Sequence, residues 1–301
     1  LNSVKEYNMQ LTTHKLKIKR KVSLKNLKKE IMPKIPKISH ELPINMLNRS
    51  FEINDYEYCL PHLLDQNSIY EKHFRDARES GSYIVMDNSL HELGEAYDTD
   101  RLMYWINELE PDEFIVPDVW QDYIKTLVNA KKWKDVELPE GTTKVAVVQA
   151  HDYASAFECY HILKNHHGYQ KIAFSYGADW YAEQFPHPNP LVGKMMGRIM
   201  TISKMYKAGL IKDKDRVHLL GCALPQEFSY YPDFPFIESI DTSNPIIHGL
   251  KRKQYNSFGL LEKESVKIDQ IGVIPLEQET LYDINHNIHK FKTLITDAYK
   301  N

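Results

Sequence analysis

The chain has 301 residues, of which 42% are hydrophobic and 26% are charged, as is usual for a globular protein with a buried core. No apolar run approaches the roughly 18 residues of a membrane span, and no apolar signal region stands near the N-terminus, so we expect neither membrane insertion nor secretion. The three cysteines are widely spaced, which argues against a disulfide framework or a thiolate zinc site and favours a reducing, cytoplasmic location.

The N-terminal segment differs in pattern from the rest of the chain. Residues 11–22 alternate apolar and basic side chains, which predicts a strand with one solvated face. Residues 23–30 predict a short basic helix, and two prolines make 33–37 an extended connector. We therefore expect residues 1–45 to form a basic extension that packs on a barrel domain of residues 46–301.

The net charge of −3 is unevenly distributed, because residues 1–40 contain eleven Lys and Arg residues against two Glu. That local charge of about +9 indicates contact with a polyanion. We expect this segment to bind nucleic acid through Lys17, Lys19, Arg20 and Lys21. The open alternative is a basic edge strand that lysines protect from pairing.

From residue 57 onward, short apolar runs alternate with helical segments. The predicted strands are 57–64, 82–86, 113–116, 144–148, 171–174, 217–220, 236–240 and, as the final barrel strand, 265–274. The predicted helices are 69–79, 99–109, 122–133, 153–165, 191–208 and 288–299. Repeated alternation predicts an α/β fold with a parallel sheet, and the number of units favours a (β/α)8 TIM barrel without a zinc subdomain. No Gly-x-Gly-x-x-Gly sequence supports a dinucleotide fold.

Polar residues follow the predicted strands where each strand ends. They are Asp87, Asp118, Gln149, Ser175, Tyr176, Gly177, Gly221 and Asp241. Because the carboxyl ends of the strands of a parallel barrel meet at one mouth, we expect these residues to share a site. The alternative is that each one caps the following helix, but glutamine is a poor N-cap.

Carboxylate and amide side chains match the N–H and C=O groups on the edge of a guanine-like base. A metal site is the other possibility, because His91 and His151 could join Asp87 or Asp118 on an ion. A barrel metallohydrolase commonly carries a His-x-His pair on an early strand, and none is present here. We therefore expect base recognition without a metal or other cofactor.

Six segments resemble, in order, motifs of the tRNA-guanine transglycosylase family. They are MDNSLHE at 86–92, VPD at 116–118, VQ at 148–149, AFSYG at 173–177, HLLGCALP at 218–225 and IDTSNP at 240–245. The Cys-rich zinc site of the family is missing, and Ile246, Ile247 and His248 stand where the family has arginines. The pattern is most similar to the divergent, often phage-encoded branch that places 7-deazaguanines in DNA, which implies the cytoplasm of the host.

The resemblance implies a base-exchange enzyme that replaces guanine in nucleic acid, with DNA favoured, by a free 7-deazaguanine base. It implies that Asp241 is the nucleophile and Asp87 the acid/base. The implied substrate-binding residues are Asp118, Gln149, Ser175, Tyr176, Gly177, His91, Leu220 and Gly221, with Lys251, Arg252 and Lys253 on nucleic acid. The open alternatives are a tRNA-directed enzyme, a non-catalytic nucleic-acid-binding subunit and a metal-dependent hydrolase.

Overall fold

The computed structural model of the chain describes residues 34–264 and 276–300. The strand expected at 11–22, the helix expected at 23–30 and the final barrel strand expected at 265–274 lie outside the described residues, as do Lys17, Lys19, Arg20 and Lys21. The described residues from 35 onward form one compact unit, which contains the eight-stranded sheet.

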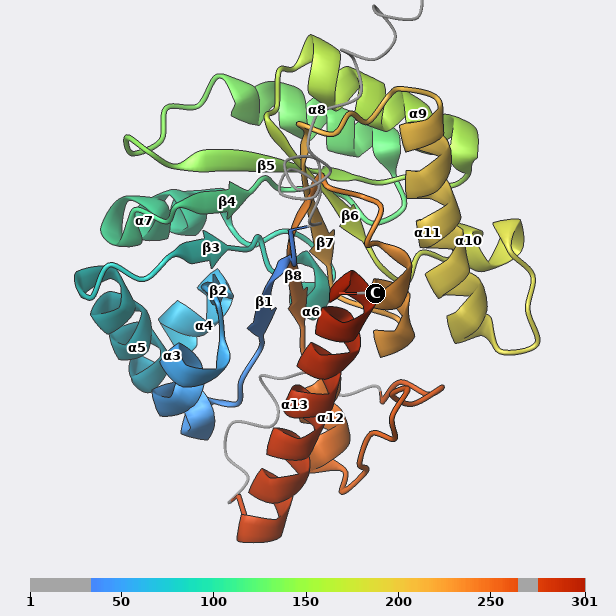
Figure 1. Cartoon of the computed structure of the whole chain (residues 1–301). Helices are drawn as coiled ribbons and strands as arrows, with labels where there is room; N and C mark the ends of the chain where they lie inside the picture. The colour runs from blue at the N-terminus through green and yellow to red at the C-terminus, as the bar shows by residue number, and fades with distance from the viewer. Residues whose placement is uncertain (1–33, 265–275, 301) are drawn as a thin grey trace, which may run out of the picture. The chain divides into compact units, whose positions relative to one another are not determined.

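Eight parallel strands form a nearly closed barrel with helices between them, which confirms the predicted (β/α)8 TIM barrel (Figure 1). The strands are β1 (Lys37–His40), β2 (Glu57–Cys59), β3 (Ile84–Met86), β4 (Glu113–Ile115), β5 (Thr143–Val148), β6 (Lys171–Ser175), β7 (Arg216–Leu220) and β8 (Ile237–Thr242). Their order is β1-β8-β7-β6-β5-β4-β3-β2, and every pairing is parallel.

The helices cover the outside of the barrel or close its ends. They are η1 (Ile44–Arg49), α3 (Ser50–Ile53), α4 (Pro61–Gln66), α5 (Ser68–Glu79), α6 (Leu90–Leu93), α7 (Thr99–Leu109), α8 (Tyr123–Lys134), α9 (Tyr153–His161), η2 (Ile162–His166), α10 (Asp179–Gln184), α11 (Pro190–Lys207), η3 (Pro225–Tyr230), α12 (Asn244–Leu250) and α13 (Gln278–Lys300). The side chains of Asp98, Asp122 and Asp152 accept N-cap hydrogen bonds at the starts of α7, α8 and α9. None of the described helices combines the length and apolar character needed to cross a bilayer.

The first barrel strand lies where the sequence predicted a connector and part of the extension. β1 (Lys37–His40) pairs with β8, and Ser39 is the register partner of Asp241. The predicted strand 57–64 is also wrong in its second half, because β2 ends at Cys59 and Pro61 begins α4. Proline is favoured at the first helical position, since its missing N–H would have no helical partner there.

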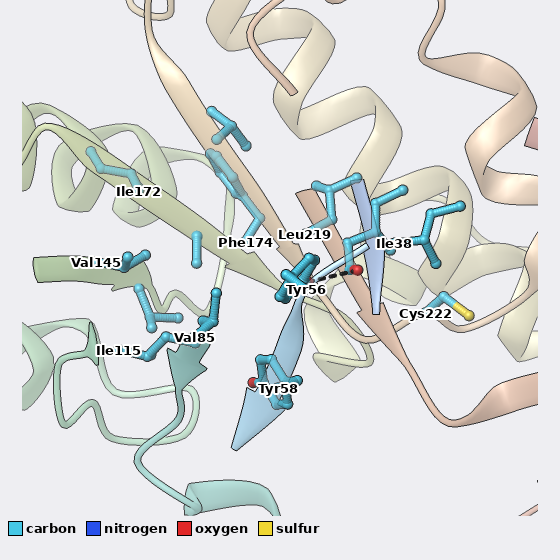
Figure 2. Close-up of a cluster of buried hydrophobic side chains, with 14 of the residues drawn as sticks. Ile38, Tyr56, Tyr58, Val85, Ile115, Val145, Ile172, Phe174, Leu219 and Cys222 are labelled. Carbon is cyan, nitrogen blue, oxygen red and sulfur yellow. Dashed lines mark hydrogen bonds between the residues drawn. The ribbon is translucent and has the colours of Figure 1, made fainter. Parts of the chain in front are cut away.

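The seam between β1 and β2 is closed largely by side chains. The Asp55 carboxylate accepts the Ile38 N–H at 2.8 Å, and the Asn54 side-chain oxygen accepts the His40 N–H at 2.7 Å. A backbone hydrogen bond also crosses this seam, from the Asp55 N–H to the Ile38 carbonyl at 2.9 Å. The Tyr56 hydroxyl reaches on to the Ile240 carbonyl at 2.8 Å, as the dashed line in Figure 2 shows.

Apolar side chains of the strands make up most of the barrel core. Figure 2 shows Val85, Ile115 and Val145, from three neighbouring strands, close to one another, and all three are buried. At the amino-terminal end of the strands the filling is polar instead. There the Lys171 ammonium lies 2.7 Å from a Glu113 carboxylate oxygen. This end closes the barrel with paired charges, whereas the opposite end carries the polar residues that the sequence singled out.

Candidate functional site at the barrel mouth

Asp241 lies near the end of β8, where its carboxylate is buried and hydrogen-bonded. His218 Nε2 lies 3.0 Å from Asp241 Oδ1, and the Gly221 N–H donates to both carboxylate oxygens at 3.2 Å. His218 comes from β7, two residues before Leu220, so its side chain points to the same face of the strand as that of Leu220. These donors stabilise a negative charge on Asp241 and fix its orientation.

His218 is held in place from two further sides. Its Nδ1 lies 2.8 Å from the Ser239 hydroxyl, and its ring stacks on Tyr58 with centroids 6.3 Å apart and planes 14° apart. Tyr58 belongs to β2, which is distant from β7 in the order of the sheet, so the two rings meet across the barrel interior. His218 stands within one of the motifs that carry the resemblance, but the sequence indicated no role for it.

Asp87 follows β3 and is a second buried carboxyl group at the mouth. Burial raises its pKa well above the usual range of a carboxyl group, and the nearby Glu92, Asp241 and Asp118 carboxylates raise this pKa further, against a hydrogen bond from the Asn88 backbone. The Asp87 carboxyl also accepts the Ser89 N–H at 3.1 Å. A raised pKa favours the protonated form of this carboxyl group, which is the form that can donate a proton.

Asp118 and Gln149 contact each other directly, as their placement after neighbouring strands suggested. Gln149 Nε2 donates to Asp118 Oδ2 at 2.7 Å, and Asn88 Nδ2 donates to Asp118 Oδ1 at 2.8 Å. Gln149 Nε2 also lies 3.3 Å from the Ser175 hydroxyl. Burial raises the pKa of Asp118, although the hydrogen bonds from Gln149 and Asn88 lower it. Asp118 and Gln149 therefore present a carboxylate and an amide within one preformed hydrogen-bond network.

Two further carboxyl groups of the mouth were not predicted from the sequence. Glu41 directly follows β1, and burial raises its pKa well above the usual range, with Asp241, Glu92 and Asp87 adding to the effect and Lys263 opposing it. Glu92 lies on α6 and is the strongest charged neighbour of Asp87. Glu41 could have been found only by recognising β1, because its place at the mouth follows from that strand.

The rim of the mouth is aromatic and partly basic. Tyr176 packs against Gly221, where φ is +58° and an added Cβ atom would clash with the Tyr176 ring. The Lys263 ammonium lies 3.6 Å from the centre of the Tyr176 ring and donates to the Cys222 carbonyl at 2.6 Å. The His91 ring also meets Tyr176, with centroids 6.0 Å apart. The expected roles of His91 and Leu220 in substrate binding stay predictions.

The remaining residues of the predicted site take varied positions. Gly177 follows β6 with φ of +83°, a backbone conformation that favours glycine. Arg252 is paired with Asp283 at 2.5 Å, and Lys253 with Glu264 at 2.5 Å, while Lys251 is exposed. Two of the three basic residues that we expected on nucleic acid are thus engaged by acidic partners of the same chain.

Neither His91 nor His151, the histidines of the metal alternative, belongs to a group of three residues with metal-ligand spacing in the described part of the chain. His151 is exposed, and its ring lies 5.5 Å from that of Tyr123. Among residues 34–264 and 276–300, the group with metal-ligand spacing consists of His248, Glu262 and Glu264. The Lys253 ammonium lies 3.0 Å from Glu262 and 2.5 Å from Glu264, so the charge of this lysine already pairs with both carboxylates.

No protein-family model matches the chain, and no curated protein matches it.

Proposed function

We propose that the chain is a base-exchange transglycosylase, which replaces guanine in nucleic acid by a 7-deazaguanine through a covalent glycosyl–aspartate intermediate. The observation that carries the proposal is the pair of buried carboxyl groups at one mouth with unlike surroundings. Asp241 accepts hydrogen bonds from His218 and Gly221, which suit an anion. Asp87 has a raised pKa, which suits an acid. Such a pair is what a double displacement at a sugar carbon requires.

The first half of the reaction breaks the bond between the sugar and guanine. An oxygen of Asp241 attacks C1′ of the nucleotide, the C1′–N9 bond breaks, and its electron pair leaves with guanine. The neutral Asp87 carboxyl group supplies the proton that guanine takes up. The hydrogen bonds that Asp241 accepts hold its carboxylate in one orientation for the attack.

The second half reverses these roles with the new base. The Asp87 carboxylate takes the N–H proton of the incoming 7-deazaguanine, whose ring nitrogen attacks C1′ and releases Asp241. Atoms and charge balance over the cycle, so the scheme needs no cofactor of its own. Retention of configuration follows from two displacements at the same carbon.

Base recognition falls to Asp118 and Gln149 in this proposal. A guanine-like ring carries N–H donors on one edge beside a carbonyl oxygen, and a carboxylate beside an amide is complementary to both. Asp118 accepts hydrogen bonds from Gln149 and Asn88, so these donors hold the carboxylate in position before a base arrives. A base in a polymer must leave its stack to reach this buried network.

The preference for DNA rests on the residues that come after Pro245. Ile246, Ile247 and His248 are buried in α12, so these positions cannot present the charged grip on RNA that the family has there. The neighbouring Arg252 and Lys253 are held by acidic residues. A tRNA-directed enzyme of the same chemistry is the second candidate, and the choice of polymer separates the two.

The test is incorporation of isotope-labelled guanine into DNA or into tRNA, followed by digestion and nucleoside analysis. We expect label in DNA with the wild-type protein and none with Asp241→Asn. Incubation with unlabelled 7-deazaguanine bases should then remove the label and insert the modified nucleoside. Labelling of tRNA alone would favour the second candidate, and labelling of neither polymer would contradict the proposed function.

A further inference from the structure

A line of hydrogen bonds runs through the barrel interior to Asp241. Lys171 Nζ donates to both Glu113 carboxylate oxygens at 2.8 and 2.7 Å and to the Ser239 hydroxyl at 3.0 Å. Ser239 Oγ lies 2.8 Å from His218 Nδ1, and His218 Nε2 lies 3.0 Å from Asp241 Oδ1. Five side chains thus connect the charged amino-terminal end of the barrel with the proposed nucleophile.

The members of this line come from strands that are not all neighbours. Glu113, Lys171 and Ser239 belong to β4, β6 and β8, so their side chains meet across the interior, as alternate strands do in one layer of a TIM barrel. Each of these three side chains is at most 5% exposed. Such layers are commonly filled by branched apolar residues, and buried charge is costly unless it is paired.

The pairing of Ser239 with His218 depends on an irregularity in the sheet. Between β7 and β8, Val217 pairs with Ile237, but the next residue, His218, pairs with Ser239. The register shift passes over Glu238 and brings Ser239 opposite His218. In an unbroken ladder His218 would face a different residue of β8, so the bulge is what joins the two ends of the hydrogen-bond line.

The direction of each hydrogen bond follows from counting protons. A lysine ammonium only donates, so Ser239 Oγ accepts from Lys171. The Asp241 carboxylate also only accepts, so His218 Nε2 is the donor to it, and the Nδ1 lone pair of a neutral ring accepts the Ser239 hydroxyl proton. A neutral His218 therefore carries its proton on Nε2 and donates it to Asp241 Oδ1.

We propose that Lys171 and Ser239 are positioning residues, which fix the Nε2–H tautomer of His218 so that it always donates to Asp241. The role of Asp241 as nucleophile rests on the proposed function, but the tautomer of His218 does not depend on it. The inference also distinguishes the two oxygens of the nucleophile. Oδ1 accepts from His218 and Gly221, whereas Oδ2 accepts from Gly221 alone among the described residues. Oδ2 is then the oxygen that attacks C1′.

The first test reads the tautomer in the protein without substrate. Long-range proton–nitrogen correlation spectra of ¹⁵N-labelled protein distinguish the two neutral imidazole forms, and His218→Gln identifies the signals of His218. We expect the Nε2–H pattern in the wild type and in Ser239→Thr, which keeps the hydroxyl group. Ser239→Ala should give a measurable share of the Nδ1–H form, because the Asp241 carboxylate alone then opposes it. An Nδ1–H pattern in the wild type, or an unchanged pattern in Ser239→Ala, would overturn the inference.

The second test follows base exchange in the same variants. We expect Ser239→Ala to lower kcat about 10- to 100-fold with little change in KM, as loss of an orienting partner does, and Ser239→Thr to recover most of the rate. Equal rates for Ser239→Ala and wild type would overturn the inference. If the wild type performs no exchange while its His218 spectrum has the expected form, the proposed function fails and the tautomer assignment stands.

Discussion

The two ends of the barrel interior both bury charged side chains, but they balance them differently. At the amino-terminal end, the cations Lys171 and Arg216 contact the anions Glu113 and Glu238 at 2.7 to 3.2 Å. At the mouth, carboxyl groups instead raise one another's pKa. Charges that compensate one another can be buried at little net cost to stability, whereas like charges held together are commonly found where chemistry is done. The comparison suggests that the first end chiefly stabilises the fold and, through Lys171 and Ser239, orients the second end, where we place the reaction.

Loss of the nucleophile is the largest effect that the comparison predicts. Asp241→Asn should lower base exchange by at least about 10⁴-fold, because an amide cannot form the covalent intermediate. The unfolding midpoint should change little, since the amide oxygen can still accept from Gly221. The measurement is incorporation of labelled guanine, with Asp215→Asn, a buried carboxylate paired with Lys164 outside the mouth, as the matched control. Exchange by Asp241→Asn at the wild-type rate would exclude Asp241 as the nucleophile.

Removal of a charge from the other end should affect stability instead. Glu113→Met leaves the ammonium of Lys171 without its closest partner and should lower the free energy of unfolding by about 3–5 kcal/mol. The double variant Glu113→Met/Lys171→Met should recover much of that loss, because neither charge then remains. Urea denaturation measures both values.

The matched control for this pair of variants is Glu108→Met. Glu108 forms an exposed ion pair with Arg75 at 3.0 Å, and its loss should cost less than about 1 kcal/mol. If Glu113→Met proved as mild as Glu108→Met, the amino-terminal end would not be the stabilising half of the comparison.

Substitution of Asp87 by asparagine should raise the stability of the protein but lower its activity. Because its pKa is raised in the folded protein, Asp87 contributes stability while protonated and loses it as pH rises through the folded pKa. Asp87→Asn should therefore raise the melting temperature at pH 8 by about 2 °C or more, yet lower exchange about 10²- to 10⁴-fold. Calorimetry and the exchange assay on one preparation measure both. A variant that is less stable at pH 8 would contradict the raised pKa.

The smallest expected effect concerns Glu41. Its pKa is raised by burial and by the nearby carboxylates, so the folded protein binds this proton more tightly than the unfolded chain does. Stability from Glu41 is complete below the usual pKa of glutamate and declines as pH rises through the folded value. The melting temperature of Glu41→Gln should therefore exceed that of the wild type by a margin that grows with pH. A margin that shrinks with increasing pH would count against the mouth as a cluster of like charges.

Most of the barrel could be predicted because its strands are short apolar runs that end in polar residues. β1 was missed because its run, KISH, holds one apolar residue and follows two prolines, so it resembles a connector. Its identity depends on pairing with β8, which no local pattern records. The change from strand to helix after β2 did carry a local signal, since Pro61 marks the start of α4. The apolar residues around Pro61 nevertheless made the whole segment resemble a strand.

The candidate site likewise has one part that the sequence predicted and one part that it did not. Asp118 and Gln149 were expected at one mouth because strand ends converge, and the structure places them in contact. The line from Lys171 through Ser239 to His218 could not be expected, because it depends on which side chains face one another across the barrel and on a shifted register. A polar residue inside a strand reads in a sequence as a solvated position, and only the closed sheet shows that it is buried.

The seam of the barrel has a consequence for how the chain folds. β1 finds its ladder partner, β8, only after about 200 further residues have been synthesised, and closing so long a loop carries a large entropic cost before any contact forms. On its other side β1 is held chiefly by Asn54 and Asp55, whose bonds are few. We expect β1 to dock last, so that the mouth, with Glu41 at the end of β1, is completed only when the rest of the barrel already exists. Amide hydrogen exchange should then be faster at Ile38 and His40 than in β5 and β6.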